Sequence, residues 1–161
     1  MDNQQFTLEE WHRKQAVANF NRTWDLIDKQ DRTFEEDMEM IHTAHASRFH
    51  WGVIGQAVNF ARGEWQIARV YALLGKGESS LFHANYSLKL CLDHQIGDFD
   101  LAFGYEAVAR AYMLLQDSEK LNAYLQLAKH AADAIEKEED KTYFLSELDT
   151  ITPLENVVGG T

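Results

Sequence analysis

Proline and cysteine are almost missing from this 161-residue sequence. The one proline, Pro153, lies near the end, so nothing before it ends a helix for want of a backbone N–H. The one cysteine, Cys91, excludes an intramolecular disulfide and suits a reducing compartment. Because Cys91 lies at helical spacing from Leu88, we expect a buried packing residue rather than a nucleophile.

Basic residues and long apolar runs are also scarce. The chain has 15 Lys and Arg against 26 Asp and Glu, a net charge of -11. Such a chain repels phosphate backbones and anionic lipid, so we expect neither nucleic acid nor a membrane as partner. No stretch approaches the ~18 apolar residues of a membrane span, and the polar, acidic N-terminus lacks the regions of a signal peptide. We therefore expect a soluble, cytoplasmic protein.

Apolar residues recur with a helical period along the chain. Hydrophobic residues make up 45% of the sequence, enough for a substantial core. Their dominant spacing of three to four predicts an all-α protein. No linker rich in Pro, Gly or Ser divides the chain, so we expect one domain over residues 1–161.

A repeat of 41 residues organises the sequence. Residues 61–80 and 102–121 are identical at eight of twenty aligned positions, among them Arg69 and Arg110. A fixed period in this range is typical of arrays whose units stack because none can bury its apolar face alone. The short loops predict antiparallel hairpins. The expected units are hairpins at about 7–52, 53–96 and 98–138, a capping helix at about 141–150 and a mobile tail at 153–161.

Local signals mark several helix ends. Thr7 and Thr33 are each followed three residues later by a glutamate, the pattern of a capping box. Gly75 is placed for a left-handed C-terminal cap. Asp98 and Ser118 are the expected caps of the next two helices.

The two clear units resemble tetratricopeptide repeats. The matching features are a small residue, an aromatic residue and a turn glycine, at Ala68, Tyr71 and Gly75 in the first unit. The second unit departs from this pattern, with Gln116 at the turn, and the period of 41 exceeds the usual ~34. The resemblance implies an α-α superhelix whose concave face is the binding surface.

An arginine stripe lies on the presumed concave face. Arg62, Trp65 and Arg69 share one side of their helix, and Asn59 lies near them. Arginines beside an exposed tryptophan can hold a carboxylate and an apolar side chain, so an acidic or C-terminal peptide is one expected partner. The candidate partner-binding residues are Asn59, Arg62, Trp65, Arg69, Glu106 and Arg110. The alternative is that Arg69 and Arg110 pair with carboxylates such as Glu64 or Glu106 and that Trp65 simply packs.

Histidines gather in the stretch from 41 to 52. Glu39, His42 and His45 have the spacing of a helical metal site, which makes a helical-bundle metal-binding protein or enzyme the alternative function. The pattern is close to what composition yields by chance, and packing inside the first hairpin is the simpler interpretation. A third possibility is a polar pocket formed by His42, His45, Arg48 and His50.

Motifs for nucleophiles, phosphates and dinucleotides are missing, so the sequence gives no basis for a cofactor or an enzyme. The sequence predicts a scaffold or adaptor that binds a protein or peptide in its concave groove. Self-association through an exposed end of the array, giving a homodimer, is a further possibility.

Overall fold

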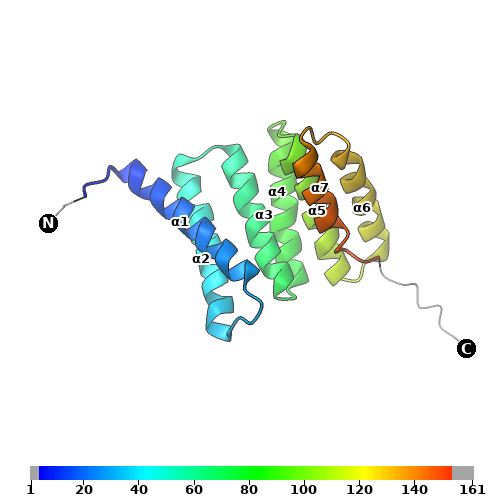
Figure 1. Ribbon diagram of the computed structural model, residues 1–161, viewed down its shortest axis with the longest axis horizontal. Coiled ribbons are helices and arrows are strands. Elements are labelled where there is room, and N and C mark those ends of the chain that lie inside the picture. Colours follow the sequence, from blue (N-terminus) through cyan, green and yellow to red (C-terminus); the bar gives the residue numbers. More distant parts are fainter. Residues whose placement is uncertain (1–3, 154–161) are drawn as a thin grey trace, which may run out of the picture.

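A computed structural model describes residues 4–153, which form seven α-helices and no strand (Figure 1). Each helix packs against the next along the chain, and contacts also join α1 to α3, α3 to α5 and α5 to α7. The chain is therefore an all-α superhelix of three helical hairpins followed by a C-terminal helix, as the sequence predicts. The helices are α1 (Leu8–Asp28), α2 (Phe34–Ile54), α3 (Ala57–Leu73), α4 (Gly77–Asp93), α5 (Asp98–Leu114), α6 (Ser118–Ala132) and α7 (Glu138–Leu148).

The 41-residue period appears directly in the second and third hairpins. Both α3 and α5, and likewise α4 and α6, begin 41 residues apart. The turns match as well: Gly75 has φ 72°, and Gln116 at the equivalent position has φ 58°. The turn therefore keeps its left-handed conformation even where the glycine that favours it is replaced.

The two expected capping boxes are present. Thr7 accepts a hydrogen bond from the backbone of Glu10, whose side chain accepts one from the backbone of Thr7. Thr33 and Glu36 make the same reciprocal pair at the start of α2. Each box satisfies two backbone donors that the first helical turn leaves without partners.

Several boundaries differ from the sequence-based expectation. The first hairpin continues to Ile54. Asp117 rather than Ser118 caps α6, accepting from the Lys120 backbone. The N-cap of α5 is Gly97, and Asp98 instead begins the helix with φ 54°.

The last hairpin ends early. Helix α6 stops at Ala132 because the chain turns tightly there and places Ile135 in the core, 4% exposed. Helix α7 then begins at Glu138, three residues before the expected start, and ends at Leu148, two residues before the expected end. Most of the tail expected at 153–161 lies outside the described residues.

Buried serines join the two helices of a hairpin. Ser87 of α4 donates to the carbonyl of Ala61 on α3 at 2.8 Å, and Ser80 donates to Ala68 at 2.9 Å. Ser47 of α2 donates to Ala16 of α1 in the same way. Small side chains at these crossings let the helix backbones approach closely while the hydroxyl finds a partner.

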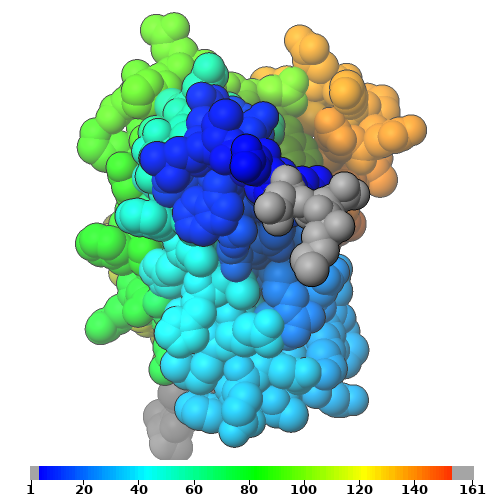
Figure 2. Space-filling model, turned by 90° about the vertical axis from the view of Figure 1, so that its left-hand side faces the viewer, coloured from blue at the N-terminus to red at the C-terminus, as the bar shows by residue number. Residues whose placement is uncertain are grey.

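The first helices of the hairpins lie on one side of the array, and α7 lies across α5 on that side (Figure 1). The hairpin of α1 and α2 forms the N-terminal end, which faces the viewer in Figure 2. Among the described residues, no helix is both long and apolar enough to cross a membrane.

Candidate functional site

The repeated arginines meet at one buried carboxylate. Glu106 of α5 is fully buried, and its Oε1 accepts from Nε of Arg110 at 2.8 Å and from Nη2 of Arg69 at 3.3 Å. Equivalent positions of consecutive repeats are neighbours on adjacent helices, which brings the two guanidinium groups together. Glu106 separates two like charges that would otherwise repel.

Helix α7 and the turn that follows it add further hydrogen bonds to this network. Nη1 of Arg69 donates to Oε2 of Glu147 at 2.9 Å. Nη2 of Arg110 donates to the Glu147 carbonyl at 3.2 Å and to Oγ1 of Thr150 at 2.7 Å. Both arginine side chains are only 13% exposed. The geometry therefore matches the pairing alternative for these two residues and leaves little of either guanidinium open to a partner.

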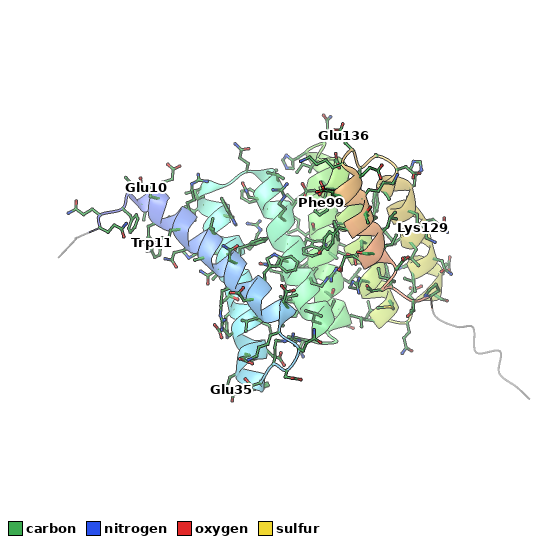
Figure 3. All side chains as sticks on the ribbon, viewed as in Figure 1. Glu10, Trp11, Glu35, Phe99, Lys129 and Glu136 are labelled. Atoms are coloured by element: carbon green, nitrogen blue, oxygen red, sulfur yellow. The ribbon has the colours of Figure 1, made fainter. Side chains whose placement is uncertain are left out.

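An aromatic pocket opens beside this network. Its volume is about 550 Å³ including its open mouth, and apolar atoms form almost all of its wall. Most of its lining residues come from α3 and α5, and the flanking helices α1 and α7 supply Phe20, Trp24 and Tyr143. Figure 3 marks Phe99, one of the lining residues, beside α7. The aromatic residues that line the pocket are Phe20, Trp24, Trp65, Phe99, Phe103 and Tyr143.

Trp65 is the central ring of the pocket. It stacks on Trp24 with centroids 5.7 Å apart and meets the edge of Phe103 at 5.4 Å. The guanidinium of Arg69 lies 5.1 Å from its centroid, on the side toward the Glu106 network. The Nε1 donor of Trp65 is buried and has no hydrogen-bond partner among the described residues.

An ion pair stands at the rim of the pocket. Nε and Nη2 of Arg62 donate to the two carboxylate oxygens of Asp100 at 2.9 and 3.0 Å. The Arg62 side chain is 56% exposed, so it is the most accessible arginine of the stripe. Asn59 caps α3 through its Oδ1 and lines a second hollow together with Arg62 and Phe20.

Burial, and to a lesser extent nearby charges, raises the pKa values of Tyr143 and Cys91. Burial first, then the carboxylates of Glu147 and Asp28, raise the pKa of Tyr143. Burial and nearby Asp100 raise the pKa of Cys91 to about 11, against a lowering by Arg62. Cys91 is 1% exposed, as expected for a packing residue.

The histidine stretch is divided between two places. His45 bonds the hydroxyl of Tyr71 at 3.0 Å. Its ring also meets His83, whose Nδ1 lies 2.6 Å from Oε2 of Glu64. Arg48 donates to the other oxygen of Glu64 at 3.0 Å. A polar network thus crosses from α2 to α4, with Gly63 leaving room for the Arg48 chain.

His50 and the nearby Glu39 make contacts elsewhere. Nδ1 of His50 lies 2.8 Å from Nδ1 of His12 on α1. Glu39 forms a two-bond ion pair with Arg22. In residues 4–153, no group of three or more His, Cys, Asp or Glu side chains is placed to hold a metal ion. The structure therefore does not gather Glu39, His42 and His45 around one ion.

Two of the candidate residues from the sequence lie in the wall of the pocket. Arg62 and Trp65 were candidates because they share a helix face, and both line it. Phe20, Phe99 and Tyr143 were missed, since each belongs to another helix and no local pattern joins them. Comparisons with protein-family models, with curated proteins and with solved structures found no match for this chain.

Proposed function

We propose that this chain is a tetratricopeptide-like interaction module that binds a segment of a partner protein on its concave side. One large apolar side chain of the partner occupies the aromatic pocket, and the Arg62–Asp100 pair lies beside its backbone. The observation that carries the proposal is the pocket itself, with its aromatic residues drawn from four helices. Such apolar hollows with a few polar groups at the rim are the usual form of binding sites.

The energetics favour an aliphatic or aromatic anchor. Burying a leucine or phenylalanine side chain contributes roughly 1.5–3 kcal/mol. By that measure a leucine anchor improves affinity over alanine about ten- to a hundredfold.

Synthetic peptides of nine residues, Gly and Ser throughout except for a central Ala, Leu or Phe, test this function. Two of the four tryptophans, Trp24 and Trp65, line the pocket, so tryptophan fluorescence reports its occupancy. We expect saturable changes with the Leu and Phe peptides and tenfold weaker binding with Ala. Equal responses to all three peptides, or none, would overturn the proposal.

A matched pair of variants locates the site. Tyr143→Ser removes a pocket ring that is 47% exposed, so the fold keeps most of its packing. Phe82→Ser removes an aromatic ring that is 72% exposed and lies outside the pocket, on α4. Binding should weaken at least fivefold in the first variant and stay unchanged in the second. An equal effect of both variants contradicts binding in the pocket.

A further inference from the structure

The cations around the aromatic pocket are already paired. Arg62 makes two hydrogen bonds to Asp100, while Arg69 and Arg110 share Glu106 and reach α7. The arginine stripe therefore carries its own counter-charges. This removes the reason to expect an acidic partner.

Carboxylates on the two flanking helices have no such partners. Asp28 follows Trp24 by one helical turn on α1, and it is exposed. Glu139 and Asp140 precede Tyr143 by one turn on α7. None of the three forms an ion pair with a described residue. Both sides of the pocket thus present unpaired negative charge.

Helix stability explains only some of these charges. Glu139 and Asp140 lie in the first turn of α7, where the helix dipole favours carboxylates. Asp28 is the last residue of α1, where the dipole disfavours a carboxylate, and the carbonyls at this end accept hydrogen bonds from Arg32 rather than from a residue of the helix. After burial and Glu147, the carboxylate of Asp28 also contributes to the raised pKa of Tyr143 on α7. The helix dipole thus accounts for Glu139 and Asp140 but not for Asp28.

We infer that the occupant of the pocket is a basic segment, in which lysine or arginine residues flank the apolar anchor. This inference rests on the proposed function and adds the charge class of the partner. The flanking cations meet Asp28 on one side and the first turn of α7 on the other. Charge complementarity of this kind selects among partners and speeds their encounter.

The test uses three peptides with the same central leucine, flanked on each side by two Lys, two Ser or two Glu. A fourth peptide, lysine-flanked around a central Ala, measures general attraction to a chain of charge -11. At low salt we expect the lysine–leucine peptide to bind at least tenfold more tightly than the glutamate peptide. This preference should shrink at about 0.5 M salt because of screening.

Two charge reversals separate a local effect from net charge. Asp28→Lys and Asp133→Lys both replace an exposed aspartate at the C-terminal end of a helix, and both change the charge by two. Asp28→Lys should weaken binding of the lysine–leucine peptide about fivefold. Asp133→Lys should change the affinity for this peptide less than twofold. Equal effects of the two variants, or tighter binding of the glutamate peptide, overturn the basic-partner inference while leaving the pocket function standing. If leucine and alanine peptides bind alike, the proposed function fails too.

Discussion

Arg69 and Glu147 lie 78 residues apart in the chain, yet Nη1 and Oε2 are 2.9 Å apart. This pair ties α7 to α3, past the intervening hairpin. It joins the network in which Glu106 is bonded to two arginines with no exposure to solvent. The repeated arginines are thus tied to the packing of α7 against α3 and α5.

Glu106→Gln should destabilise the fold strongly. The change keeps the shape of the side chain but leaves two nearly buried guanidinium groups with one carboxylate fewer. Removing one partner of a buried ion pair costs about 3–5 kcal/mol. Urea unfolding measures the loss, and Glu119→Gln, at an exposed site on α6, is the control, expected within about 0.5 kcal/mol of wild type. A loss below 1 kcal/mol contradicts a structural role for the network.

Acid should weaken the fold through two histidines. Burial and the neighbouring His12 lower the pKa of His50, and burial with His83 lowers the pKa of His45. The unfolded chain, with the ordinary value of 6.5, then takes up protons before the folded chain does. The contribution of these two neutral histidines to the free energy of unfolding is therefore fully present well above pH 6.5 and is lost as pH falls below that value.

Urea midpoints between pH 7.5 and 5 measure this slope. His50→Asn should flatten the slope, since Asn does not titrate in this range. His130→Asn, at an exposed position on α6, is the comparison variant, expected to keep the wild-type slope. A slope that His50→Asn leaves unchanged would assign the acid sensitivity to other groups.

Cys91 should resist thiol reagents in the folded protein. Its pKa of about 11 leaves roughly one thiol in a thousand ionised at pH 8, and the side chain is 1% exposed. Labelling with a chromogenic disulfide should be at least a hundredfold slower than in 6 M urea. Rapid labelling of the native protein would show that α4 opens locally or that the thiol is accessible.

Gln116→Gly should stabilise the turn between α5 and α6. A left-handed conformation costs a non-glycine residue about 1–2 kcal/mol, and Gln116 has φ 58°. The greater freedom of glycine in the unfolded chain offsets part of this, leaving a gain of about 0.5–1 kcal/mol. The mirror change, Gly75→Gln, introduces the same strain where a Cβ meets nothing within 4 Å. Thermal unfolding should move in opposite directions for the two variants, and a shift of the same sign in both contradicts this account.

The sequence predicted the features that local chemistry determines. The capping boxes at Thr7 and Thr33 depend on residues three apart, and the 41-residue period depends on equal packing needs in each hairpin. These signals predicted the class of fold and most helix starts. The cap at Asp117 was missed because two adjacent polar residues can both cap, and only the backbone decides between them.

The candidate site was less predictable, because it depends on contacts between distant segments. The stripe of Arg62, Trp65 and Arg69 was visible on one helix, but the partners of its arginines were not all visible. Glu147 lies on a helix outside the repeat, so no periodic signal connects it with Arg69. The six pocket rings likewise come from four helices, each with its own pattern.

The tie between Arg69 and Glu147 also bears on how the chain folds and unfolds. Apart from this tie, contacts between helices run to the next helix or the one after it, a pattern that favours fast folding. We expect a bond that spans 78 residues to form only after the intervening hairpin has assembled. Its loss should therefore speed unfolding and leave the folding rate nearly unchanged. On this basis we expect the docking of α7 to slow the unfolding of the assembled array.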